Sequence, residues 1–404
     1  MSIDILMVSI PGVYYKEYTT DWNAIAKLLD EHQNFGLLLK STSYLKDIEE
    51  AIEAKATSPL EKLKMAYDTV KMIKWNGQEA IIADHVSLKT CYNEMEGNSA
   101  EINLILQGLL NRLDIPSYPI VLSTRKNGYL PKFFPSIEKL NYTIISAQIG
   151  DETYLIDASE KLMPLGMLPE RCINGYGQLL NEEKASEIKL ITKKISQSLV
   201  LMQLVINDDL SISGSIGERL IDYAAFDYRK EYESFNSQEE YVKNLMAEEN
   251  GLSIEDYSVQ NLDSIYQPVV TKMNVKLENQ CYSIGDEVFI NPLLMHQLTE
   301  NPFKIEKRNY PIEFPTGFKR VYSITYKIPE GYQIAELPKT QNVVLPDKAG
   351  SFVYQVQEIG GSIMVGCTFE ISKTLFLPAE YDIIKQLYDI IIKKEAEPII
   401  LKKI

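Results

Sequence analysis

The chain has 404 residues, and its 41 Lys and Arg against 56 Asp and Glu give a formal charge of −15. A nucleic-acid binder neutralises phosphates with clustered Lys and Arg, so this acidic balance, with no basic cluster in the sequence, argues against a nucleic-acid partner. The longest apolar runs, such as residues 199–206, are far shorter than the roughly 20 residues that a membrane-spanning helix needs. We therefore expect a globular protein of two to three domains without a membrane span.

The cysteines and histidines are few and scattered. No two of the four cysteines have the spacing of a zinc ribbon or of a small disulfide framework, and no histidine lies within four residues of another histidine or a cysteine. We therefore expect neither a bound metal nor a cofactor. The residues concerned are Cys91, Cys172, Cys281, Cys367, His32, His85 and His296.

The first part of the chain has a helical pattern. Apolar residues recur at helical spacing in residues 22–29 and 44–52. A third helix is expected to run to about residue 74, because Ser58 can cap it, Pro59 fits its first position and Glu61 lies where a capping box requires it.

A fourth expected helix has a similarly definite start. Asn98 can cap it, Glu101 can reach back to the cap, and Ser99 is then its first residue. Its apolar residues recur every three or four positions and should form a buried stripe. They are Ile102, Ile105, Leu106, Leu109, Leu110 and Leu113.

Strands follow, and two of them form a hairpin with a defined register. Residues 142–149 and 152–157 are separated by Gly150-Asp151, and Gly at the first central position favours a type II′ turn. Ile149 should then pair with Glu152, so that the two residue numbers of every pair in the hairpin sum to 301. This register places Tyr142 and Asp157 on the same face as diagonal neighbours.

The second half is strand-rich and is interrupted by helical signals. A loop-rich stretch at residues 163–180, with several Pro and Gly, leads to an expected boundary after residue 185. Alternating strands follow, with a helical insertion at about residues 218–248 and a last helix at about 378–394. The many alternating runs are typical of a β-sandwich.

Several motifs resemble a known family. They are Gly97-Asn98-Ser99-Ala100-Glu101-Ile102-Asn103, the strand at 119–125, Leu140-Asn141-Tyr142, Tyr154-Leu155-Ile156-Asp157-Ala158 and Gly166-Met167-Leu168-Pro169-Glu170-Arg171-Cys172. Together they resemble the transglutaminase-like, papain-related superfamily, and the whole chain resembles the C-terminal part of a bacterial envelope protein family of unknown function.

This resemblance implies an α+β fold with three parts. Residues 1–20 would be the remnant of a preceding β-domain. Residues 21–185 would form a transglutaminase-like core, with helices packed on an antiparallel sheet. Residues 186–404 would form a β-sandwich-like domain with the helical insertion and the C-terminal helix.

The resemblance also implies a degenerate catalytic triad. Active members have Cys and His where this chain has Ser99 and Tyr142, and only Asp157 matches. A helix N-terminus stabilises a thiolate, but a serine hydroxyl needs an adjacent base, and neutral tyrosine, whose pKa is about 10, is a poor one. We expect Ser99, Tyr142 and Asp157 to converge as a vestigial triad, with no catalytic residue, no cofactor-binding residue and no metal ligand.

Three other local interpretations stay open. A cation near Tyr142 would make it a better base, and Arg125 is the candidate on a neighbouring strand. Cys91, with His85 nearby in sequence, could be a displaced nucleophile. Cys172 lies in the loop-rich stretch and is expected to be a small buried side chain.

The predicted function is non-enzymatic, that of a binding or assembly module of the bacterial cell envelope with an unknown protein or glycan partner. One alternative is an amide hydrolase or acyltransferase that uses Ser99 or an unrecognised site. Another is carbohydrate binding through strand tyrosines such as Tyr322, Tyr326 and Tyr354. The family resemblance implies a periplasmic or envelope location. Because the start has no recognisable secretory signal, a cytoplasmic location is expected if that start is genuine.

Overall fold

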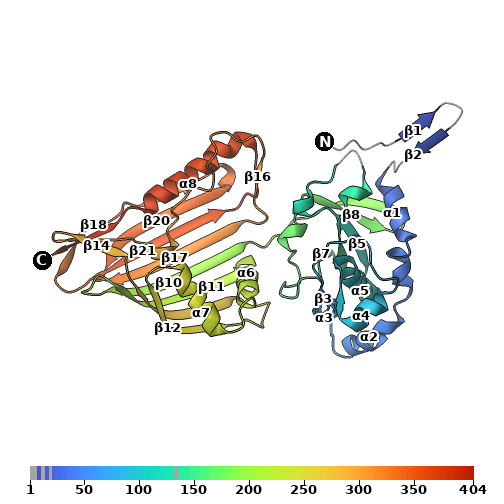
Figure 1. Cartoon of the computed structure of the whole chain (residues 1–404), viewed down its shortest axis with the longest axis horizontal. Helices are drawn as coiled ribbons and strands as arrows, with labels where there is room; N and C mark the ends of the chain where they lie inside the picture. Colours follow the sequence, from blue (N-terminus) through green and yellow to red (C-terminus); the bar gives the residue numbers. More distant parts are fainter. Residues whose placement is uncertain (1–6, 11–13, 18–20, 132–134) are drawn as a thin grey trace. The chain divides into compact units, whose positions relative to one another are not determined.

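The chain folds into two units, Met1–Lys193 and Lys194–Ile404, which Figure 1 shows with their helices and strands. The computed structural model describes residues 7–10, 14–17, 21–131 and 135–404. Both units mix helices and sheets, so the predicted α+β class is confirmed. The boundary differs from the predicted one, because β9 (Lys184–Lys189) pairs with β8 (Tyr176–Asn181) and belongs to the first unit.

A five-stranded antiparallel sheet forms the scaffold of the N-terminal unit, with the strand order β7-β6-β5-β8-β9. The other strands are β5 (Ser117–Leu122), β6 (Tyr142–Ile149) and β7 (Glu152–Ile156). Two short strands, β3 (Lys74–Trp75) and β4 (Glu96–Gly97), pair separately. The helices of this unit are α1 (Trp22–Asp30), α2 (Lys46–Glu53), α3 (Pro59–Val70), α4 (Leu88–Glu94) and α5 (Ser99–Arg112).

Helix α5 is the central helix of this unit. Every residue from Ser99 to Leu110 is buried, including the polar Glu101, Asn103 and Gln107. The predicted apolar stripe is therefore buried, but the helix is enclosed on all sides, as is typical of a helix in the middle of a core. Buried polar side chains in such a helix must find hydrogen-bond partners.

The β6–β7 hairpin has the predicted register. Ile149 pairs with Glu152 and Ile145 with Ile156, and both pairs sum to 301. Gly150 has a φ of 59°, as the first central residue of a type II′ turn requires.

The C-terminal unit is built on an eight-stranded sheet with the order β12-β13-β11-β10-β17-β21-β20-β19. Neighbouring strands are antiparallel except β10 and β17, which are parallel. The strands are β10 (Ser196–Ile206), β11 (Ile212–Asp222), β12 (Leu252–Gln260), β13 (Val269–Leu277), β17 (Phe318–Lys327), β19 (Gln341–Val344), β20 (Gly350–Ile359) and β21 (Ser362–Ile371).

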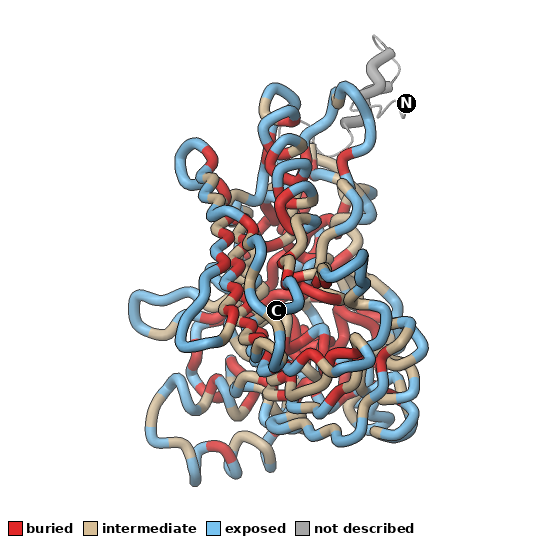
Figure 2. Tube along the Cα trace, turned by 90° about the vertical axis from the view of Figure 1, so that its left-hand side faces the viewer, coloured by how far each residue is buried: buried red, intermediate tan, exposed pale blue. Residues whose placement is uncertain are grey.

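One face of this large sheet is covered by other elements of the same unit. A four-stranded sheet, β14-β15-β23-β18, and helix α8 (Tyr381–Glu395) share one apolar core with it. Buried and exposed residues alternate along the large strands, as Figure 2 shows by colour. The smaller strands are β14 (Cys281–Ile284), β15 (Glu287–Ile290), β18 (Tyr332–Glu336) and β23 (Ile399–Lys403), together with the separate pair β16 (Ile312–Glu313) and β22 (Leu375–Phe376).

The helical insertion is shorter than predicted. It comprises α6 (Tyr223–Tyr232) and α7 (Gln238–Glu248), whereas residues 218–222 continue β11 and pair with β10. The expected helix start at Glu218 is therefore wrong, because strands on both sides hold this segment extended. The C-terminal helix lies close to its predicted position.

The predicted β-domain remnant at residues 1–20 lies largely outside the described residues. Of this segment, β1 (Met7–Ile10) pairs with β2 (Tyr14–Glu17). Among the described residues, no helix has the length and apolar character to span a bilayer.

Candidate functional site

Ser99 begins helix α5, as predicted from the sequence before it. The Asn98 side chain accepts a hydrogen bond from the Glu101 backbone N–H at 2.9 Å, and the Glu101 carboxylate accepts one from the Asn98 N–H, also at 2.9 Å. This reciprocal capping box fixes the first turn of the helix. It also fixes where the Ser99 side chain lies.

The hydroxyl of Ser99 is held by backbone groups rather than by a catalytic partner. Its Oγ accepts a hydrogen bond from the Ala80 N–H at 2.9 Å and donates one to the Ala80 carbonyl at 3.2 Å. The Ser99 N–H donates to the Gln78 carbonyl at 3.2 Å. Ser99 is 0% exposed, and its hydroxyl lies against the backbone of Ala80.

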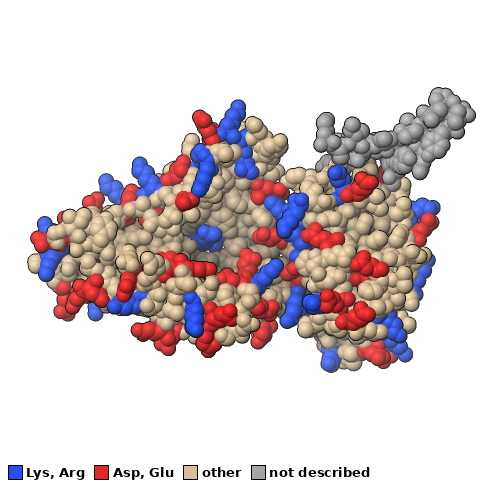
Figure 3. Space-filling model, in the orientation of Figure 1, with Lys and Arg blue, Asp and Glu red and all other residues tan. Residues whose placement is uncertain are grey.

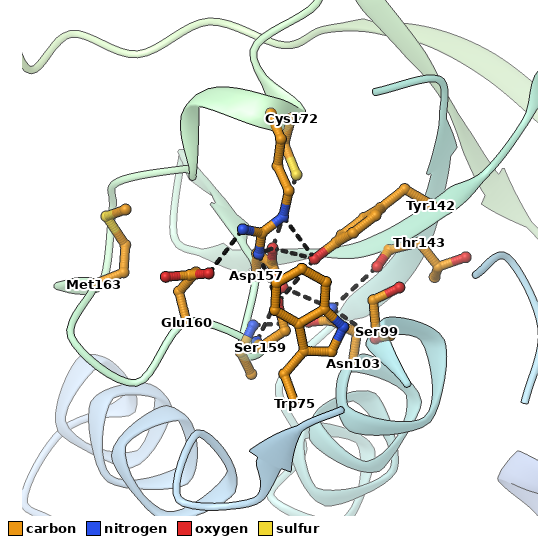
Figure 4. A network of polar contacts seen from close by, with 12 residues as sticks. Trp75, Ser99, Asn103, Tyr142, Thr143, Asp157, Ser159, Glu160, Met163 and Cys172 are labelled. Carbon is orange, nitrogen blue, oxygen red and sulfur yellow. Dashed lines mark hydrogen bonds and ion pairs between the residues drawn. The ribbon is translucent and has the colours of Figure 1, made fainter. Parts of the chain in front are cut away.

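Tyr142 and Asp157 lie close together at the open end of the β6–β7 hairpin, as the register requires. The Tyr142 hydroxyl donates a hydrogen bond to Asp157 Oδ2 at 2.8 Å, and it lies 2.8 Å from the Ser159 hydroxyl. Figure 4 shows both side chains within one network of polar contacts. The predicted approach of the Tyr142 hydroxyl to Asp157 is confirmed.

Asn103 links the start of α5 to Asp157. Its amide nitrogen donates to the Ser99 carbonyl at 3.0 Å and to Asp157 Oδ1 at 2.9 Å. Its amide oxygen accepts the Ala158 N–H at 2.9 Å. Ser99 therefore lies beside this network through its backbone and through Asn103 (Figure 4), whereas its hydroxyl is turned to Ala80.

Arg171 is the cation of the site. Its Nη2 donates to Asp157 Oδ2 at 3.0 Å and its Nη1 to Glu160 Oε1 at 2.7 Å, while its Nε donates to the Tyr142 hydroxyl at 3.1 Å. The guanidinium also lies over the Trp75 ring, 4.4 Å from its centroid. This arrangement combines two ion pairs with a cation–π contact.

Tyr142 and Arg171 both have raised pKa values in this network. Burial and the adjacent negative charge of Asp157 raise the pKa of Tyr142 well above its ordinary value, so the phenol keeps its proton at neutral pH. Burial alone would lower the pKa of Arg171, but the charges of Asp157 and Glu160 raise it above its usual value. Both groups therefore hold fixed protonation states across the physiological range.

The two nearby thiols are not activated. Cys172 is 0% exposed, and burial together with Asp157 raises its pKa well above normal. Cys91 is also 0% exposed, and burial raises its pKa to about 12. His85 lies near Cys91 in sequence, but its Nδ1 is 2.6 Å from Glu101 Oε1.

Most of the residues that surround Asp157 were not predicted from the sequence. Arg125, the candidate cation near Tyr142, donates a hydrogen bond from its Nη1 to the Ile173 carbonyl at 3.2 Å. Arg171 stands in a motif that the resemblance had used, and Asn103 lies one helical turn after Ser99. The helical spacing between Ser99 and Asn103 could therefore have placed Asn103 at the site. No sequence pattern indicates that the loop with Arg171 folds back onto Asp157.

Within the described ranges, no group of three or more His, Cys, Asp or Glu side chains lies in a position to hold a metal ion. The described contacts of Asp157 and Glu160 with Arg171 are instead ion pairs.

Comparisons with known proteins relate the chain to one family and to one solved structure in particular. Residues 286–401 match a family described as a domain of unknown function with a solved structure (DUF3858). The fold is similar to that of a protein from Parabacteroides distasonis named a "putative protease", with a TM-score of 0.54 and 16% sequence identity. The similarity covers 94% of this chain but 58% of that one. No curated protein matches the chain, and at this identity the likeness to the solved structure concerns the fold alone.

Proposed function

We propose that the N-terminal unit is a transglutaminase-like domain without catalytic activity, and that the chain acts as a binding or assembly module of the bacterial cell envelope. The motif resemblance supports the first part, as does the approach of Tyr142 to Asp157 beside the helix that Ser99 begins. Ser99, Tyr142 and Asp157 then belong to a structural network rather than to an active site. In this network Asp157 is a buried carboxylate that needs partners.

One observation carries the non-catalytic interpretation. The Ser99 hydroxyl is buried and both accepts from and donates to the Ala80 backbone. A serine nucleophile must give its proton to an adjacent base during attack. Tyr142 is protonated, and its hydroxyl already contacts Asp157, Ser159 and Arg171, so it does not supply that base.

An amide hydrolase or acyltransferase is the alternative from a different class. The fold likeness to a protein named a "putative protease" favours it, although the name belongs to that protein. For this alternative, the segment around Ala80 would have to move away from Ser99. The Tyr142 phenol would also have to lose its proton.

Carbohydrate binding through the strand tyrosines has less support. Tyr322 is 9% exposed, and Tyr326 and Tyr354 are both 0% exposed. These rings pack in the core of the C-terminal unit and offer no open face to a sugar.

The uncovered face of the large sheet supports a binding role. On β10, Leu199, Leu201 and Val205 are exposed and alternate with buried residues of the core. Exposed apolar residues grouped on one strand are typical of surfaces that contact another molecule. We call this face of the eight-stranded sheet the outer face.

The activity screen tests the non-catalytic part of the proposal. Purified wild-type protein and the Ser99→Ala variant are assayed for amine incorporation and for peptide hydrolysis, and both should stay at background. Ser372→Ala, at an exposed serine of the other unit, is the matched control. Activity that is lost in Ser99→Ala but kept in Ser372→Ala would establish the enzyme alternative.

Affinity capture from separate envelope and cytosolic fractions tests the binding part. Leu201 is 53% exposed on the outer face and Leu377 is 52% exposed elsewhere in the same unit, so Leu201→Lys and Leu377→Lys add the same charge at equally exposed sites. We expect Leu201→Lys alone to lose the envelope proteins that the wild-type chain retains. Equal capture by both variants, or capture only from the cytosolic fraction, would contradict the proposal.

A further inference from the structure

The C-terminal unit contains a cavity between its inserted helices and the large sheet. Its volume is about 260 Å³, which corresponds to the space of roughly nine waters at about 30 Å³ each. Its walls come from β10 to β13, from α6 and α7, and from the turn at Leu294–His296. Figure 1 shows α6 and α7 in front of these strands. In Figure 3 the same unit is hollowed, with acidic side chains along the lower edge of the hollow and a basic side chain inside it.

Three strands bring a carboxyl group and a hydroxyl group together on the cavity floor. Glu218 of β11 pairs with Val200 of β10 on one side and with Thr271 of β13 on the other. Directly paired residues of neighbouring strands present their side chains on the same face. The two polar side chains therefore lie next to each other, and both line the cavity.

Two residues that line the cavity carry buried polar atoms without a hydrogen-bond partner in the described part of the chain. Thr271 is 2% exposed, and its Oγ1 makes no hydrogen bond. The Nε2 atom of His296 is also buried without one. Buried polar atoms are normally paired, so these two atoms point to a ligand or solvent in the cavity.

Glu218 has little to stabilise its charge. Its one described hydrogen bond comes from the Ser198 hydroxyl at 3.3 Å, and burial raises its pKa above the ordinary value. A cation placed against this carboxylate would replace the lost hydration.

The lining favours positive charge in a ligand. It includes the carboxylates Glu218, Glu248 and Glu249, and none of the described lining residues is Lys or Arg. Burial and the nearby positive charge of Arg320 lower the pKa of His296 to about 4. The imidazole is therefore neutral at pH 7 and does not repel a cation.

Aromatic rings form one wall of the cavity. The hydroxyls of Tyr228 and Tyr257 are hydrogen bonded to each other, and the Tyr241 ring lies edge-on to both, with centroids 5.8 and 5.9 Å away. Aromatic ring faces attract organic cations. Met273, Met295 and aliphatic side chains complete an apolar wall.

We propose that this cavity binds a small organic amine, with the ammonium group at Glu218 and Thr271 and the apolar body against the tyrosines and methionines. The carboxylate and the Thr271 hydroxyl both accept hydrogen bonds from the ammonium group. The site is independent of the Ser99 region, which belongs to the other unit.

The test uses the full chain labelled with ¹³C at its methionine methyl groups. Met273 and Met295 line the cavity, and Met273→Leu and Met295→Leu assign their signals. The probe is 2-phenylethylamine at pH 7, and the comparison ligand is 2-phenylethanol, which has the same shape without the charge. We expect saturable shifts of these two signals with the amine, and at least about tenfold weaker binding of the alcohol.

Variants separate charge recognition from simple filling of an apolar space. Glu218→Gln and Thr271→Val should each weaken amine binding, Glu218→Gln by about tenfold or more. Glu358→Gln, at an exposed position on β20, should bind as the wild type does. Thermal unfolding checks that each variant is folded, and if Glu218→Gln is not, the comparison of amine with alcohol on the wild-type chain decides. Equal binding of amine and alcohol, unchanged binding by Glu218→Gln, or no shift of Met273 and Met295 would overturn the proposal.

Discussion

Glu395 makes the stability of the C-terminal unit depend on pH. This residue of α8 is 4% exposed. Its Oε2 accepts the Leu298 N–H at 2.6 Å, and its Oε1 lies 3.7 Å from the Cys367 thiol. Burial raises the pKa of the carboxyl group from 4.5 to about 7, although these hydrogen bonds and the charge of Arg320 oppose the rise.

The sign of the effect follows from the proton affinity. A carboxyl group with a higher pKa in the folded protein binds its proton more tightly when folded, so the free energy of unfolding falls as the pH rises from 4.5 to about 7. One pKa unit corresponds to about 1.4 kcal/mol, so the loss above this range is about 3 kcal/mol. Glu395→Gln is neutral at every pH and can still accept the Leu298 N–H. We therefore expect it to stabilise the unit by about 2 to 3 kcal/mol more at pH 8 than at pH 5.

The tryptophans provide an internal control for the measurement. Both tryptophans of the chain, Trp22 and Trp75, lie in the N-terminal unit. Urea unfolding followed by circular dichroism reports both units, whereas tryptophan fluorescence reports the first. At pH 8, Glu395→Gln should move the circular dichroism transition of the C-terminal unit to higher urea and leave the fluorescence transition unchanged.

Two outcomes would refute this reasoning about Glu395. An equal gain at pH 5 and pH 8 would mean that the substitution improves packing rather than removing a buried charge. No gain at pH 8 would mean that the carboxylate is not penalised in the folded protein. Glu358→Gln, at an exposed position, should change the free energy of unfolding by less than about 0.5 kcal/mol.

Further predictions concern the network around Asp157 and the thiols. Arg171→Met should lower the stability of the N-terminal unit by about 3 to 5 kcal/mol, since it leaves Asp157 buried without its cation, and tryptophan fluorescence in urea measures the loss; an unchanged midpoint would contradict it. Tyr142→Phe should cost about 1 to 3 kcal/mol in the same assay, because it removes a hydroxyl that both donates and accepts, and a stabilised variant would count against the network. Burial raises the thiol pKa of all four cysteines, which are Cys91, Cys172, Cys281 and Cys367. In the native protein at pH 8, a thiol reagent should therefore react slowly with each of them, and rapidly only after unfolding. Fast labelling of any of the four in the native protein would disprove this.

The sequence predicted those features of the site that depend on residues close together in the chain. The capping box of Asn98 and Glu101 needs residues three positions apart, and the hairpin register needs a two-residue turn with Gly150. The position of Ser99 and the pairing of Tyr142 with Asp157 follow from these two features.

The remaining parts depend on contacts between distant segments. Sequence position made Arg125 a candidate cation, but the loop after β7 folds back and brings Arg171 onto Asp157. Residues 218–222 have a helical apolar pattern, yet hydrogen bonds from β10 and β13 on both sides keep most of them extended. The secondary structure of such a segment depends on the strands that it contacts in the folded protein, and these contacts cannot be read from a single sequence.

The parallel pairing of β10 with β17 has a consequence for biosynthesis. Ser196 pairs with Phe318, so a ribosome must add more than a hundred residues after β10 before its partner exists. At a translation rate of roughly 5 to 20 residues per second, one edge of β10 stays unpaired for on the order of 10 s. During that time the edge can pair with the same strand of a neighbouring nascent chain. Slower translation between β13 and β17 should therefore increase aggregation of the newly made protein, and chaperone capture of this intermediate should decrease it.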